Sequence, residues 1–119
     1  MTIFRHIPLS VHAGLETLAA PLLMAAPFLL GFGEAATVVS VLVGVLLLGL
    51  ALQIPGPQRS ISLSSHASFD YLLATFAIVG GVAVGIVTDA WEPTAFLVGI
   101  GAAMVALTAS TRFSAPRGL

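Results

Sequence analysis

Charged residues divide the chain into four long uncharged segments. In chain order these segments hold 17, 24, 18 and 19 residues, and they are bounded by Glu16, Glu34, Arg59, Asp70, Asp89, Glu92 and Arg112. A membrane-spanning helix needs about 20 mostly apolar residues, with a range of about 17–25. Open strands are excluded in lipid because their backbone groups would stay unpaired. We therefore predict an all-α membrane protein with four transmembrane helices near residues 10–32, 35–54, 64–87 and 93–111.

The low charge content excludes most other classes of protein. Only 8% of the 119 residues are charged, whereas a soluble domain carries about 25%. A net charge of -1 provides no basic patch for nucleic acid, and the lack of cysteine excludes disulfides and thiolate metal sites. We predict a single membrane domain over residues 1–119 whose main partner is the lipid bilayer, without nucleic acid.

The arginines indicate an orientation in the membrane. All of them fall in the two terminal segments or the middle loop, at Arg5, Arg59, Arg112 and Arg117. Positive residues are enriched in cytoplasmic loops. We therefore predict a multi-pass protein of the cell (inner) membrane with both termini cytoplasmic and Trp91 at the outer interface.

The two halves of the chain are similar in sequence. The segment IPLSVHAGLETLAA from Ile7 aligns with ISLSSHASFDYLLA from Ile61 at an offset of 54, and residues 42–44 align with 97–99 at an offset of 55. We place repeat one at 7–54 and repeat two at 61–110. Because each repeat holds two spans, the repeats are predicted to be parallel helical hairpins related by a pseudo-two-fold axis along the membrane normal.

A motif near the end of the first predicted helix resembles a known family. Residues 26–32 read APFLLGF, and an apolar helix with small residues follows over 38–52. This arrangement resembles the SPW-repeat family of small prokaryotic membrane proteins, which is named for a Ser-Pro-Trp motif at such a helix end. Here Ala26 and Phe28 replace Ser and Trp, and residues 80–82 of the second repeat lack the motif. The resemblance implies a small prokaryotic membrane protein and no defined activity.

A His-x-x-x-acid pattern occurs once in each repeat. His12 and Glu16 are four residues apart, as are His66 and Asp70, so each pair shares one helix face. We expect the four to form a polar cluster near the inner edge of the hydrocarbon core. The pairing is predicted to join the helices, His12 to Asp70 and His66 to Glu16; the alternative is pairing within each helix.

Three functions are open for such a cluster. The first is a structural polar clamp in a small non-catalytic module that acts through structure or interaction, by itself or within a larger membrane complex. The alternative is a cofactor-binding membrane protein in which His12 and His66 ligate haem or a metal ion. The third is a proton or ion pathway in an oligomer. No motif of a hydrolase, phosphate loop or zinc protease is present, so we predict no enzyme, no catalytic residue and no dedicated metal motif, and the sequence identifies no cofactor.

Serine and proline complete the local predictions. Ser10 and Ser64 precede the two histidines and are predicted to cap the helix N-termini. Pro21 and Pro27 lie inside the first predicted helix, where they free backbone carbonyls four residues earlier, including that of Leu23. We expect a neighbouring hydroxyl or water to satisfy such a carbonyl.

Overall fold

A computed structural model describes residues 6–53 and 62–113 and contains four helices. They are α1 (Leu9–Leu29), α2 (Glu34–Ala51), α3 (Leu63–Thr88) and α4 (Trp91–Ala109). All four are long and apolar enough to cross a membrane. The prediction of an all-α chain with four candidate spans is therefore confirmed, with helix ends that differ from the predicted ones by up to three residues.

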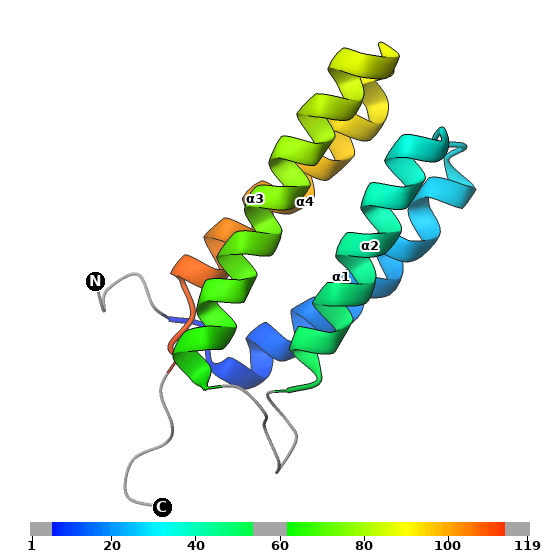
Figure 1. Ribbon diagram of the computed structural model, residues 1–119. Helices are drawn as coiled ribbons and strands as arrows, with labels where there is room; N and C mark the ends of the chain where they lie inside the picture. Colours follow the sequence, from blue (N-terminus) through cyan, green and yellow to red (C-terminus); the bar gives the residue numbers. More distant parts are fainter. Residues whose placement is uncertain (1–5, 54–61, 114–119) are drawn as a thin grey trace, which may run out of the picture.

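The helices form two antiparallel hairpins with short loops (Figure 1). The first loop passes through Gly31, whose φ of 70° lies in the left-handed region that glycine favours. The second loop is Asp89 and Ala90, and Asp89 also has a positive φ, of 58°. Both loops lie at one end of the molecule, and α1 and α3 begin together at the other end (Figure 1). Side chains near the starts of α1 and α3 can therefore meet.

The hairpins contact each other mainly through α2 and α3, while α1 and α3 make almost no backbone contact. Apolar side chains from all four helices form one core: Ala20, Leu23, Val43, Leu47, Leu73, Ala74, Ala77, Leu97 and Met104. Between α2 and α3 an apolar groove of about 630 Å³ opens to the outside, lined among others by Leu46, Phe69 and Phe76. The described residues 6–53 and 62–113 thus fill the interface between the hairpins only partly.

Glycine allows close approach within each hairpin. A Cβ added at Gly44 would lie 2.9 Å from the carbonyl oxygen of Ala20, and one added at Gly101 would lie 2.9 Å from that of Ala74. Gly81 likewise faces Leu97 of α4. Small residues at such positions let helix backbones pack closely. These glycines therefore serve contacts within hairpins.

The buried positions of the two hairpins follow the same spacing. Five buried positions of α1 recur in α3 at an offset of 54: 12/66, 16/70, 20/74, 23/77 and 27/81. Five of α2 recur in α4 at an offset of 57: 36/93, 40/97, 44/101, 47/104 and 51/108. The sequence identities align α2 with α4 at an offset of 55 instead. The offset of the buried positions thus increases from 54 for α1 and α3 to 57 for α2 and α4. The greater length of α3, which has 26 residues against 21 in α1, accommodates this increase.

Two local predictions have different outcomes. The hydroxyl of Ser40 on α2 donates a 2.6 Å hydrogen bond to the carbonyl oxygen of Leu23, the group that Pro27 leaves free, so this prediction is confirmed. The capping prediction is wrong: the N-cap residues are Pro8 for α1 and Ser62 for α3, and only Ser62 caps with its side chain. Ser10 and Ser64 lie inside the helices because each helix begins one residue earlier.

Candidate functional site

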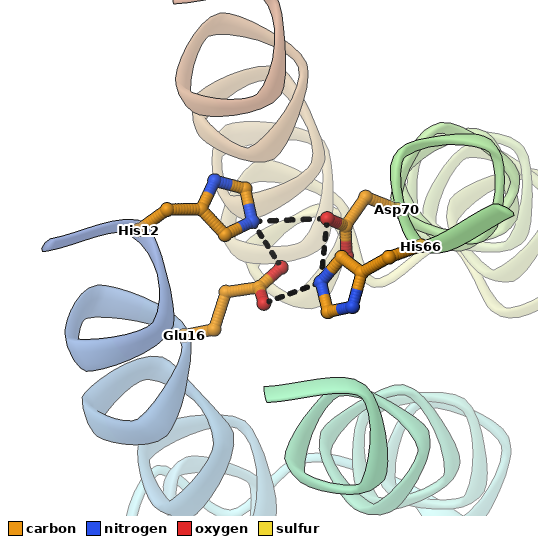
Figure 2. A group of neighbouring side chains, drawn as sticks. All are labelled: His12, Glu16, His66 and Asp70. Carbon is orange, nitrogen blue, oxygen red and sulfur yellow. Dashed lines mark hydrogen bonds and ion pairs between the residues drawn. The ribbon is translucent and has the colours of Figure 1, made fainter. Parts of the chain in front are cut away.

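The four residues of the duplicated pattern form one buried cluster, the His–acid cluster of His12, Glu16, His66 and Asp70 (Figure 2). His12 and Glu16 are the fourth and eighth residues of α1, and His66 and Asp70 hold the same places in α3. Because the two helices begin at the same end, equal positions bring the four side chains to one level. Their side chains are between 0% and 2% exposed.

Each imidazole contacts both carboxylates. Nε2 of His12 lies 2.9 Å from Oδ2 of Asp70 and 3.1 Å from Oε2 of Glu16. Nε2 of His66 lies 3.1 Å from Oδ2 of Asp70 and 3.4 Å from Oε1 of Glu16. The predicted pairing between helices is therefore present, and so is the pairing within each helix that was its alternative. The contacts close into a ring of four groups (Figure 2).

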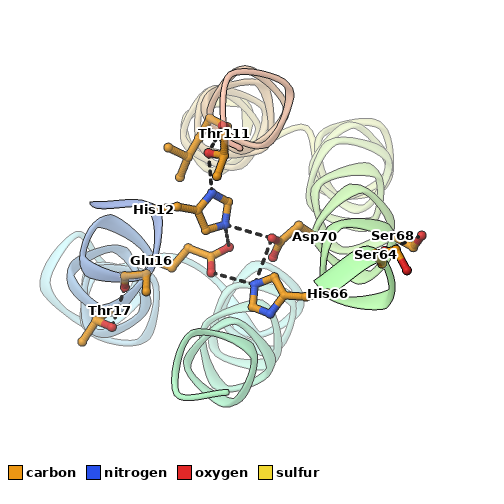
Figure 3. A network of polar contacts seen from close by, with 10 residues as sticks. His12, Glu16, Thr17, Ser64, His66, Ser68, Asp70 and Thr111 are labelled. Atoms are coloured by element: carbon orange, nitrogen blue, oxygen red, sulfur yellow. Dashed lines mark hydrogen bonds and ion pairs between the residues drawn. The ribbon is translucent and has the colours of Figure 1, made fainter. Parts of the chain in front are cut away.

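Thr111, just after α4, fixes the orientation of His12 (Figure 3). Its hydroxyl donates to the carbonyl oxygen of Leu107 at 2.6 Å, so it accepts the 2.8 Å hydrogen bond from Nδ1 of His12. Nδ1 therefore carries a hydrogen, and the carboxylates at Nε2 require another donor there. With both carboxylates ionised, His12 donates from both ring nitrogens and is an imidazolium.

The segment that carries Thr111 is tied to the start of α1. The backbone NH of Ile7 donates to Ser110 at 2.9 Å, and the NH of Arg112 donates back to Ile7 at 3.0 Å. The half-buried Phe113 then packs against both imidazoles, with ring centroids 5.1 Å from His12 and 6.0 Å from His66. Sequence reasoning missed Thr111 and Phe113 because neither has a matching residue at the repeat offset, and only the folded chain brings them there.

Three buried polar atoms have no hydrogen-bond partner within the described ranges 6–53 and 62–113. They are Nδ1 of His66, Oδ1 of Asp70 and Oγ1 of Thr108. A buried polar group that lacks a partner costs about 1–3 kcal/mol. Two of these atoms belong to the His–acid cluster itself, so the contacts within the cluster leave one of its nitrogens and one of its oxygens without a hydrogen bond.

This geometry favours some functions over others. Haem ligation would need the two rings on opposite faces of a macrocycle, but the rings lie in a T-shaped arrangement 5.8 Å apart with both carboxylates between their Nε2 atoms. A proton pathway needs further titratable groups along the spans. Within the part of the chain that the structure describes, the other acidic residues are Glu34, Asp89 and Glu92, all at the loop end. The arrangement suits a polar clamp or a small cation.

The structure describes only some of the residues on which the predicted orientation depends. Arg112 directly follows Thr111 at the cluster end, whereas Arg5, Arg59 and Arg117 lie outside the described residues. Trp91 begins α4 at the opposite end, is 52% exposed, and donates from Nε1 to Asp89 at 3.1 Å. An exposed tryptophan at a helix end is typical of an interfacial anchor.

Comparisons with protein-family models, curated proteins and solved structures found no match for this chain. The resemblance to the SPW-repeat family therefore stays a prediction, and the function has to be argued from the site itself.

Proposed function

We propose that the protein is a small non-catalytic four-helix module of the cell membrane in which the His–acid cluster clamps the two hairpins together. One observation carries this proposal. The helices α1 and α3 make almost no backbone contact, yet their side chains meet in a ring of contacts of 2.9–3.4 Å. The His–acid cluster is thus the principal contact between α1 and α3.

The bilayer explains why such a clamp is useful. Lipid tails are as apolar as leucine, so burial of apolar surface does not drive one hairpin toward the other. Polar contacts between helices favour the association of the hairpins instead, because a polar group has no good partner in hydrocarbon. The clamp also selects one register, since only one alignment of α1 and α3 brings both pairs to the same level.

We also propose that the hairpins are parallel repeats related by an approximate two-fold axis along the membrane normal. The equal places of the pairs in α1 and α3, and the constant offsets of buried positions, support this arrangement. As a structural or interaction module, the protein would act by itself or as a subunit of a larger membrane complex.

The clamp predicts an energetic coupling between the hairpins. In a double-mutant cycle with His12→Ala and Asp70→Ala, we expect a coupling energy of about 0.5–3 kcal/mol, because the two groups are in contact. The single His12→Ala change should lower the free energy of unfolding by about 1–3 kcal/mol, since Asp70 loses a buried partner. The measurement is equilibrium unfolding in mixed micelles of mild detergent and dodecyl sulfate, with a chelator present.

A cycle between Glu34→Ala and Asp70→Ala is the matched control, because Glu34 is exposed at the opposite end of the molecule. These two changes should be additive within about 0.5 kcal/mol. Coupling near zero for His12 and Asp70, with clear coupling between His12 and Glu16, would reject the clamp in favour of separate pairs within each helix.

We also propose that both termini face the cytoplasm, and this orientation predicts which positions react from outside the cell. The chain has no cysteine, so single changes Thr2→Cys, Gln58→Cys and Ala90→Cys introduce unique labels. An impermeant thiol reagent added to intact cells should label position 90 and leave 2 and 58 protected until the membrane is opened. If positions 2 and 58 were labelled and position 90 were protected, the topology would be the inverse of the proposed one.

A further inference from the structure

We propose that the His–acid cluster is a four-ligand site for one divalent transition-metal ion, and that Zn²⁺ fits it best. The ligand atoms would be Nε2 of His12, Nε2 of His66, and one oxygen each from Glu16 and Asp70, all of which lie within 4.8 Å of one another. The inference uses the geometry of the cluster and does not depend on its role as a clamp.

The distances match a tetrahedral set of ligands. Zn²⁺ binds nitrogen and oxygen at about 2.0–2.2 Å, which places neighbouring tetrahedral ligands about 3.3–3.6 Å apart. With Oε2 of Glu16 as its ligand oxygen, three of the separations between ligand atoms are 2.9, 3.1 and 3.1 Å, and all four atoms lie within 4.8 Å of one another. To hold the ion, the short separations would widen by a few tenths of an ångström and the widest would close toward the tetrahedral value.

The charges select a divalent ion. Two carboxylates and two neutral imidazoles carry a charge of -2, and the site is almost completely buried. A buried net charge is costly in an apolar surrounding, so an ion of charge +2 is the one that leaves the site neutral. A monovalent or trivalent ion would leave one uncompensated charge beside lipid.

The surroundings of His12 prepare it to act as a ligand. Thr111 accepts a hydrogen bond from Nδ1 and so holds the hydrogen on that nitrogen. Nε2 is then the atom that can give its lone pair to a metal. Metal-binding histidines almost always have such a partner on the second nitrogen, which sets both tautomer and ring orientation.

A second observation points to a ligand. Asp70 is completely buried, yet its Oδ1 has no hydrogen-bond partner among the described residues. Both of its contacts to the imidazoles use Oδ2, so Oδ1 takes part in neither of them. A divalent ion on Asp70 offsets the carboxylate charge more strongly than a shared hydrogen bond does, and the free oxygen offers it a second contact.

The donor set distinguishes between ions. Ca²⁺ takes six to eight oxygen ligands and Mg²⁺ requires an octahedron with several waters, whereas this site has two nitrogen donors and hardly any room for solvent. Imidazole suits Zn²⁺, and a closed site with four protein ligands is typical of structural zinc. Phe113 packs against both rings and adds to the enclosure. We therefore assign a structural role to the ion.

Loading the site exchanges protons for the ion. With both imidazoles protonated and both carboxylates ionised, the cluster is neutral. The Nε2–H bonds of His12 and His66 break, two Nε2–metal bonds form, and two protons leave to solvent for each Zn²⁺ bound. The cluster remains neutral, with the metal in place of the two protons. Metal and protons therefore compete for the same atoms.

The test uses the full chain in detergent after removal of metal with a chelator. Competition with a chromogenic chelator should show one Zn²⁺ per chain. Co²⁺ loaded instead should give the intense visible absorption of four-coordinate cobalt, displaced by Zn²⁺. Failure to retain Zn²⁺, or the pale spectrum of six-coordinate Co²⁺, would overturn the site.

Variants test the proposed geometry. Thr111→Val removes the partner of Nδ1 and should weaken Zn²⁺ binding about 10–100-fold while Co²⁺ keeps its four-coordinate spectrum. Thr75→Val is the matched control, because Thr75 is exposed on α3 and bonds only its own helix, and binding should not change. Equal affinity of the two variants would reject the assigned role of Thr111 and with it this geometry. A chain that shows the His12–Asp70 coupling but retains no Zn²⁺ keeps the clamp and loses the metal site.

Discussion

Replacing Asp70 with alanine should lower the free energy of unfolding by about 3–5 kcal/mol, the loss expected when one partner of a buried charged pair is removed. Oδ2 of Asp70 lies within 3.1 Å of both Nε2 atoms, so this single change removes contacts to both imidazoles. The Nε2 atoms of His12 and His66 would then share only Glu16 as a buried acceptor. Equilibrium unfolding in mixed micelles, in the presence of a chelator, measures the loss.

Two further variants separate charge from volume. Asp70→Asn keeps the size of the side chain and removes its charge, so a loss similar to that of Asp70→Ala would assign the effect to the carboxylate. Glu34→Ala removes an exposed acid at the far end and should change stability by no more than about 0.5 kcal/mol. Losses of equal size for Asp70→Ala and Glu34→Ala would show that the cluster does not hold the hairpins.

Much of the fold could be predicted because charge spacing and turn residues act locally. The uncharged segments predicted four helices, and glycine, which tolerates a positive φ, occupies position 31 in the first loop. The register of the second hairpin could not be read in this way. Identities such as that between Gly44 and Gly99 suggested an offset of 55, whereas packing places Gly101 opposite α3 and leaves Gly99 open. Burial depends on the partner helix, which the identity of a residue does not reveal.

The cluster was predictable in membership and only partly in geometry. The repeated spacing of His12, Glu16, His66 and Asp70 identified all four residues, because helical periodicity and the repeat together place them on facing sides. The sequence could not show that each Nε2 meets both carboxylates, since that depends on how closely α1 and α3 approach. Thr111 lies 99 residues from His12 in the chain, so local patterns carry no signal for it.

Adding one methyl group at Gly101 and at Gly99 should change stability in opposite directions. A Cβ at Gly101 would lie 2.5 Å from Cγ1 of Ile78 and 2.9 Å from the carbonyl oxygen of Ala74, and a backbone atom cannot move aside without separating α3 from α4. Overpacking of this kind costs about 1–3 kcal/mol. At Gly99 a Cβ meets nothing within 4 Å. Gly99→Ala should therefore stabilise the helix by about 0.5–1 kcal/mol, because alanine loses less backbone entropy on folding than glycine does.

The pair is a close comparison because both changes are glycine to alanine on α4, two residues apart and in the same membrane environment. Unfolding in mixed micelles measures both variants against the unmodified chain. Gly44→Ala should behave like Gly101→Ala, since Gly44 lies as close to α1 as Gly101 does to α3. If the changes at 99 and 101 instead exchanged their effects, α4 would be rotated relative to α3, and the offset of 55 would describe the second hairpin better than 57.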